Sequence, residues 1–449
     1  MRHALRWLVG LTLACLACER PVPASAIRER LAGDRPNLVL IVVDTLRADF
    51  TTPYGSADDT SPELSRWAAR GVLFDRALAQ SSWTKMSVAS FLTSLWPGSH
   101  RIREAQDGLA DGAVTLAEVL RDAGYATYAV QTNGWLHQSF GFHQGFDRYM
   151  FPKPGGDPRL GQPSLWSHAD HVFDEAARLL DARDRERPFF LYLHFMDVHE
   201  YASPPEFKTF GTGDRGAYLA AIRWVDDAVR RVREKLADTG DLAHTVMVWM
   251  SDHGEELGEH GVHGHARNVL TPVLRVPLVV RLPFPVAPPV RVTAQVRNLD
   301  VAPTLLELVG VPVPNDFEGR SLVPLMTGEA PESDRPSFAA LGVPLFPDAS
   351  VQRSVSDGGW TYARNALPPP DDPDAYEGKA VAPGAEFLFD RRVDPGENAN
   401  LAGREVRETQ RMRGMLDDHL AEAGSGVVQP GVRIDPGIAE RLRAMGYLR

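Results

Sequence analysis

Short apolar runs and amphipathic segments alternate along most of this chain. The runs, at residues 37–43, 125–130, 189–193 and 245–250, are rich in β-branched and aromatic residues. Such runs are typical of strands that are buried on both faces of a parallel sheet. Segments with helical periodicity lie between or beside them, at 62–70, 115–123, 168–182 and 216–237. This alternation predicts an α/β fold in which helices cover both faces of a mostly parallel sheet.

The pattern changes after a further predicted helix at 301–309. Short runs at 359–362 and 386–390 predict antiparallel strands of a smaller domain, and helical patterns follow at 405–420 and 438–445. The resulting domain prediction is a signal at 1–18, a linker at 19–36, a large domain at 37–345, a small α+β subdomain at 346–401 and a helical tail at 402–449.

The first residues have the features of an export signal. Arg2 and Arg6 precede an apolar run at 8–17, which is too short to span a bilayer as a mature helix. The small residues before Cys18 resemble a bacterial lipoprotein processing site. We therefore expect a periplasmic or cell-envelope lipoprotein anchored at Cys18, or otherwise a secreted protein. Cys15 and Cys18 are the two cysteines of the chain, so no disulfide is expected in the mature protein.

The charge of the chain narrows the choice of partners. The 449 residues carry a formal net charge of −11. An acidic surface makes nucleic acid and an anionic membrane poor partners, so membrane contact is expected only through a lipid at Cys18. An acidic protein of this kind needs a local positive centre before it can bind an anion, and a bound metal ion is the simplest one.

Carboxylate and imidazole side chains stand after three of the predicted strands. Asp44 follows the first strand, Asp252 and His253 follow the last, and His199 comes shortly after the third. Ligands of open α/β sheets bind at the carboxyl ends of the strands, so these side chains are expected to converge. An aspartate after a strand is also a common turn former, so the set carries this prediction rather than Asp44 alone.

The order of these motifs resembles that of the sulfatase family in the alkaline phosphatase superfamily. The resemblance covers residues 36–401, and its motifs lie at 44–49, 54–55, 60–62, 141–149, 199, 251–261, 275–277, 300–306 and 389–401. The resemblance implies an alkaline-phosphatase-like three-layer sandwich with a central, mostly parallel sheet and a small C-terminal α+β subdomain. It also implies an exported, metal-dependent hydrolase of sulfate or phosphate esters, whose anionic substrate is a glycan or a lipid.

Three positions depart from the family pattern. Thr84 stands where the family has a cysteine or serine that is converted to formylglycine, and the proline and arginine of that motif are Met86 and Val88. Formylglycine is therefore not expected. Thr45 replaces the second aspartate of the usual pair, and His265 replaces a lysine that would contact sulfate.

A threonine at the nucleophile position resembles the phosphotransfer branch of the superfamily, which includes lipoteichoic acid synthases and phosphoethanolamine transferases. That resemblance implies one divalent metal ion held by Asp44, Thr84, Asp252 and His253, with the Thr84 hydroxyl as nucleophile. A shell of mixed oxygen and nitrogen ligands favours zinc or manganese, with calcium or magnesium as alternatives.

Other side chains near these motifs have competing interpretations. His199 and His265 are candidates for contacting the ester oxygens or protonating the leaving group. The alternative interpretation of Thr84 is a helix N-cap, a role that threonine fills well. Lys85 is expected to be a solvated surface residue. His194, His260 and His263 are expected to be loop histidines without a role.

Two other functions remain open at this point. A transferase would move a phospho-group through Thr84 onto a glycan, but such enzymes usually carry several membrane helices before the catalytic domain. A catalytically silent fold would bind a sulfated or phosphorylated glycan as a lipoprotein module. Such a module has no need of Asp44 and Asp252, both of which are present, so the sequence favours the hydrolase.

Overall fold

The computed structural model describes most of the chain beyond residue 21. The described ranges are 22–33, 35–152, 158–160, 167–342, 345–346, 351–365, 384–422, 426–444 and 447–448. The predicted signal, with Cys15 and Cys18, lies outside the described residues. Within those ranges, no helix has both the length and the apolar character needed to cross a membrane.

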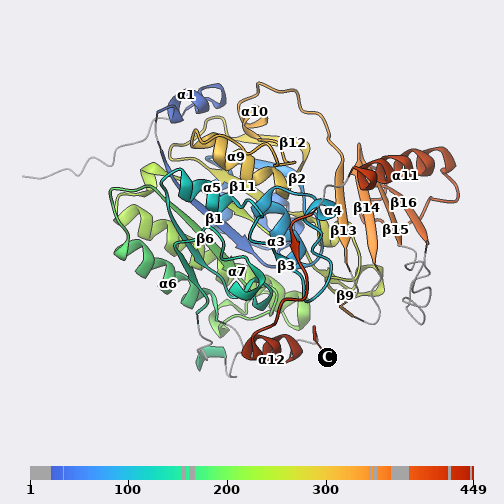
Figure 1. Ribbon diagram of the computed structural model, residues 1–449, viewed down its shortest axis with the longest axis horizontal. Coiled ribbons are helices and arrows are strands. Elements are labelled where there is room, and N and C mark those ends of the chain that lie inside the picture. The colour runs from blue at the N-terminus through green and yellow to red at the C-terminus, as the bar shows by residue number, and fades with distance from the viewer. Residues whose placement is uncertain are drawn as a thin grey trace, which may run out of the picture.

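A nine-stranded sheet forms the centre of the molecule (Figure 1). Its order is β10-β2-β11-β7-β1-β6-β4-β5, and β12 pairs with β2. The five strands from β7 to β5 are mutually parallel, whereas β11 runs antiparallel to both of its neighbours. The strands are β1 (Asn37–Val43), β2 (Val72–Leu78), β4 (Ala126–Val130), β5 (Arg148–Met150), β6 (Phe189–Phe195), β7 (Thr245–Met250), β10 (Arg275–Val276), β11 (Leu278–Arg281) and β12 (Val290–Arg297).

Helices cover both faces of this sheet because successive side chains of each strand point to opposite sides. Leu40 and Val42 of β1 pack in one apolar core, and Ile41 and Val43 pack in another. The first core includes residues of α3 (Thr84–Thr93), α5 (Leu116–Asp122), α9 (Val301–Leu308) and α10 (Val323–Met326). The second includes residues of α2 (Pro62–Ala68), α6 (Ala169–Ala182) and α7 (Gly213–Asp238). The predicted three-layer α/β sandwich is confirmed.

A smaller antiparallel sheet lies beside the large one, at the right of Figure 1. Its strands are β13 (Ser337–Leu341), β14 (Gln352–Asp357), β15 (Trp360–Asn365) and β16 (Glu386–Asp390), in that order. The helix α11 (Val406–Ala421) packs on it, since Met412 and Leu416 share a core with Val355, Tyr362 and Leu388. The small α+β unit thus begins before residue 346 and includes the first helix of the predicted tail.

Two segments that were expected to be peripheral fold onto the large domain. In the predicted linker, α1 (Ile27–Leu31) buries Ile27 fully in the first core. In the predicted tail, β17 (Val428–Gln429) pairs with β3 (Gly108–Leu109), and α12 (Pro436–Ala444) buries Ile438 and Leu442. Figure 1 shows the chain returning from α11 to α12 beside the large sheet. Apolar residues spaced for one helical face explain both contacts.

Candidate active site

The strand-end side chains converge at one edge of the large sheet. Strand β1 lies between β6 and β7, so Asp44 comes next to Asp252 and His253. The ligand atoms of these three residues lie within 4.8 Å of one another. His253 Nε2 is 3.7 Å from Asp44 Oδ1 and 3.5 Å from Asp252 Oδ2. The predicted convergence is therefore present in the fold.

These three residues fit a divalent cation because of their negative charge and because two of their oxygens lack hydrogen-bond partners. Asp44 and Asp252 are fully buried, and their Oδ1 and Oδ2 atoms, respectively, have no hydrogen-bond partner among the described residues. Buried carboxylate oxygens of this kind are costly unless a positive charge faces them. Burial raises the pKa of Asp252, but His253 and His194 outweigh it and hold that pKa well below its usual range.

His253 presents the correct nitrogen to this group. Its Nδ1 lies 3.0 Å from the carbonyl oxygen of Gly254, to which it can only donate. Nε2 is then the nitrogen that a metal ion could use, and it faces the two carboxylates. Glycine is needed at 254 because a Cβ there would lie 2.1 Å from the carbonyl oxygen of Pro272.

The Thr84 hydroxyl lies against this cluster. Its Oγ1 is 3.2 Å from His253 Nε2 and 3.4 Å from Asp44 Oδ2. Thr84 is the first residue of α3, and the N-cap is Trp83, with no side-chain hydrogen bond to the helix. The hydroxyl therefore points into the site instead of capping the helix, and the amino end of α3 faces the same region.

Thr45 has a different part in the site. Its Oγ1 donates to the carbonyl of Asp44 over 2.7 Å, while its backbone N–H donates to Asp252 Oδ1. The residue adopts φ of 60°, a left-handed conformation that is uncommon for a β-branched side chain. Thr45 thus holds the Asp252 carboxylate through its backbone N–H, while its side-chain oxygen bonds the main chain and does not point at the cluster.

His199 and His265 form a second layer beside the cluster. The ring centroids of His253 and His265 are 4.7 Å apart, and those of His265 and His199 are 4.8 Å apart. Burial lowers the pKa of His199, but hydrogen bonding to Glu200 outweighs burial and raises that pKa to about 9. Burial lowers the pKa of His265 well below its ordinary value. One imidazole is thus protonated at neutral pH and the other is neutral.

Three residues at the site carried no predicted role. Asn133 Nδ2 donates to Asp44 Oδ2 over 2.7 Å and lies 3.4 Å from Thr84 Oγ1. His194 Nε2 lies 3.7 Å from Asp44 and 3.9 Å from Asp252, and neither ring nitrogen has a hydrogen-bond partner among the described residues. Tyr447 contacts both outer imidazoles. Asn133 and His194 stand at or near the ends of predicted strands, and this position could have indicated from the sequence that they belong to the site.

The expectation for Lys85 is wrong. Lys85 is fully buried, and its Nζ donates to the carbonyl oxygens of Ala105 and Asp107 over 2.8 and 2.6 Å. The ammonium also lies 3.4 Å from the ring centroid of Phe140. A loop that follows α3 and α4 (Pro97–His100) closes over this side chain, so the helical pattern of α3 alone could not reveal its burial.

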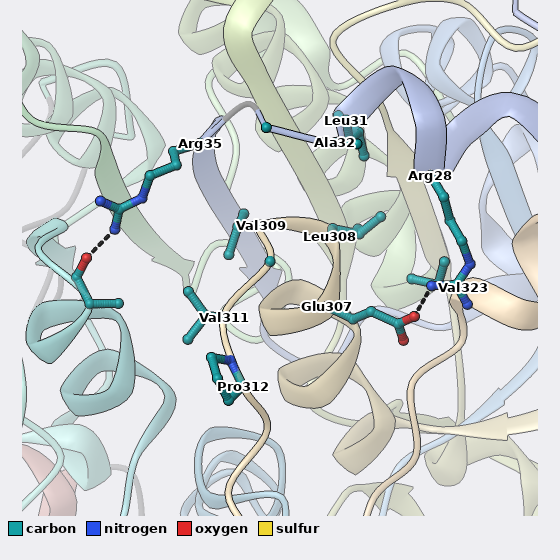
Figure 2. Close-up of a pocket in the computed structure, with 13 residues that line it drawn as sticks. Arg28, Leu31, Ala32, Arg35, Glu307, Leu308, Val309, Val311, Pro312 and Val323 are labelled. Atoms are coloured by element: carbon teal, nitrogen blue, oxygen red, sulfur yellow. Dashed lines mark hydrogen bonds and ion pairs between the residues drawn. The ribbon is translucent and has the colours of Figure 1, made fainter.

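A pocket of about 610 Å³ lies at the amino ends of the strands, away from the cluster (Figure 2). Its lining includes Arg35 and Ala123, which stand shortly before β1 and β4. Its cations are engaged within the protein, since Arg28 pairs with Glu307 and Arg35 donates to the carbonyl of Ala123. This pocket therefore takes no part in the site at the carboxyl ends.

Comparison with known proteins gives consistent matches. A family model described as Sulfatase matches residues 36–311. Steryl-sulfatase of Rattus norvegicus is 27% identical over 419 residues, covering 67% of this chain and 72% of that protein. A protein solved in complex with its substrate D-glucosamine-2-N,6-O-disulfate superposes with a TM-score of 0.70 at 18% identity, covering 86% of this chain and 98% of its own. The phosphonate monoester hydrolase of Agrobacterium radiobacter gives 0.69 at 20% identity, covering 86% and 95%. The two structures confirm the expected fold.

Proposed function

The chain belongs to the sulfatase family of ester hydrolases, and from that premise we propose that it cleaves a sulfate ester through Thr84 at a single divalent cation. The observation that carries this proposal is the contact of the Thr84 hydroxyl with His253 and Asp44, whose partner-free oxygen faces the same point. A buried alcohol placed beside unsatisfied carboxylates is suited to nucleophilic attack on an anionic ester.

Asp44, Asp252, His253 and the Thr84 hydroxyl would hold the cation. When bound, the cation would polarise the ester oxygens and lower the pKa of the hydroxyl. The mixed carboxylate, imidazole and hydroxyl set favours zinc or manganese over calcium and magnesium, which prefer all-oxygen shells. His194, which lies on β6, faces both carboxylates from the other side of β1.

The chemistry follows from the groups around Thr84. Attack by Oγ1 on sulfur forms an Oγ–S bond and breaks the bond from sulfur to the alcohol oxygen, while the hydroxyl proton passes to water. His199, protonated at neutral pH because its pKa is about 9, gives a proton to the departing alcohol. Water then cleaves the threonine ester, which releases sulfate and restores the hydroxyl.

A second candidate substrate is a phosphate ester. The observation in its favour is Thr84 itself, because an ordinary alcohol forms a phosphate ester that water can cleave at phosphorus. A formylglycine hydrate, which would expel sulfate by itself, is not expected from threonine. The alcohol portion of either ester is proposed to be a glycan or a lipid, and transfer to a second alcohol would start from the same threonine ester.

One assay separates these substrates. The purified chain is freed of metal with a chelator, reloaded with zinc, manganese, calcium or magnesium, and incubated with aryl sulfate, aryl phosphate and aryl phosphodiester. Cation-dependent release of the phenol from aryl sulfate supports the proposal. Release from the phosphate compounds alone assigns the enzyme to the second candidate. No release with any metal or ester contradicts both.

Export is part of the proposal. Arg2, Arg6 and the apolar run at 8–17 support it, as do the small residues before Cys18. Mass spectrometry of membrane and soluble fractions should find a mature chain that begins at Cys18 and carries lipid, or a secreted chain processed nearby. A cytoplasmic protein that retains Met1 contradicts the proposal.

A further inference from the structure

One tyrosine hydroxyl bridges the two outer imidazoles of the site. The Tyr447 hydroxyl lies 2.6 Å from His265 Nε2 and 2.9 Å from His199 Nε2. Burial holds the pKa of Tyr447 well above its ordinary value, so the hydroxyl keeps its proton. It therefore donates to one imidazole and accepts from the other. Both Nε2 atoms are therefore engaged by this single group.

The ring of Tyr447 fills the space next to these imidazoles. Its exposed fraction is 7%, and its centroid lies 5.7 Å from that of Trp135 and 5.5 Å from that of Phe346. Trp135 follows Asn133, the residue that contacts Asp44 and Thr84. The phenol is thus packed as a wall of the site, and an ester oxygen cannot reach the two imidazoles while it is there.

The segment that brings Tyr447 to the site is held by short elements. We call residues 426–444 and 447–448 the closing segment. It pairs with β3 through Val428 and Gln429, bonds the flanking loops through Val427 and Val432, and buries Ile438, Ala439 and Leu442 of α12. The N–H of Tyr447 donates to the carbonyl of Leu442. A two-residue strand and a nine-residue helix at the rim of the first core can open without unfolding the large sheet, so local opening costs less than global unfolding.

We propose that the closing segment is a built-in cover, and that the Tyr447 hydroxyl occupies the position of the ester oxygen until an anionic ester displaces it. The inference rests on the proposed function, because His199 acts on the departing alcohol of the ester there. The phenol satisfies both imidazoles in the closed state. An incoming ester must replace these two hydrogen bonds, so the closed state weakens binding of every substrate.

Two variants test the cover. Tyr447→Phe keeps the ring and removes the bridging hydroxyl, and Tyr447→Ala removes both. The matched control is Tyr128→Ala, because Tyr128 is equally buried, at 8% exposed, but packs in the core on the opposite face of the sheet. The affinity of the metal-loaded protein for inorganic sulfate is measured by calorimetry, alongside kcat/KM for aryl sulfate.

The cover predicts a graded gain. Loss of the two hydrogen bonds together with the ring should tighten sulfate binding on the order of tenfold in Tyr447→Ala, and loss of the hydrogen bonds alone should give a smaller gain in Tyr447→Phe, with none in the control. The kcat/KM should rise in parallel. In the wild type, sulfate should also speed hydrogen exchange in α12.

Opposite results overturn the cover. Unchanged or weaker sulfate binding in both Tyr447 variants means that the phenol does not compete with the anion. A fall in kcat/KM in Tyr447→Phe with unchanged sulfate binding makes Tyr447 a contributor to turnover instead. If no variant hydrolyses any ester, the proposed function fails, and sulfate binding still decides the cover.

Discussion

Replacing Thr84 separates a nucleophile from a structural hydroxyl. In Thr84→Val the side chain keeps its shape and loses only Oγ1, so no cavity forms in this fully packed position, which is 1% exposed. The three contacts of Oγ1, to His253, Asp44 and Asn133, are 3.2 to 3.4 Å long. Hydrogen bonds of this length contribute about 1 kcal/mol together, so the free energy of unfolding should change little.

The rate should change far more. Removal of a nucleophile typically lowers kcat by several powers of ten, and about 5 kcal/mol of added barrier corresponds to nearly four of them. Thr84→Ser keeps the hydroxyl and should retain measurable turnover. The assay is release of phenol from aryl sulfate and aryl phosphate by the metal-loaded proteins, with urea unfolding as the stability measurement. Wild-type kcat in Thr84→Val would refute the role of this hydroxyl.

Three further changes test other parts of the site. Because the raised pKa of His199 keeps it protonated below about 9, kcat/KM should fall as pH rises through about 9, and Glu200→Gln should move that fall to lower pH. A pH profile unaffected by Glu200→Gln excludes His199 as the acid. Lys85→Ala should lower the free energy of unfolding by about 3 kcal/mol, since two buried carbonyls lose their donor, and urea titration measures this. Gly254→Ala should weaken cation binding and stability together, because its Cβ meets the carbonyl of Pro272, and unaltered metal affinity would show that the loop adapts.

Local patterns predicted the sheet and the residues at its carboxyl edge. Asp44, Asp252 and His253 lie within three residues of the ends of buried strands, and parallel pairing of those strands is enough to bring them together. The geometry of Thr84 is consistent with its predicted role, since the hydroxyl points at these residues. These features depend on the order of the strands and on residues that lie close to the strand ends in sequence.

The features that escaped prediction depend on contacts between distant parts of the chain. Tyr447 lies 248 residues from His199 and 182 from His265 in sequence, and no periodicity links them. Lys85 has the charge of a surface residue and is buried because a separate loop supplies carbonyls to its ammonium. His194 was grouped with loop histidines although it ends a strand beside β1, where its register with Val42 places it near the carboxylates.

The most direct test is the metal content and activity of Asp252→Asn beside the wild type. Asparagine keeps the size of the side chain and its hydrogen bonds to the backbone while removing the charge that faces the site. Elemental analysis should find about one divalent ion per wild-type chain and a large loss in Asp252→Asn, with ester hydrolysis falling in proportion. A variant that keeps both the ion and the activity of the wild type would contradict a catalytic cation at this position.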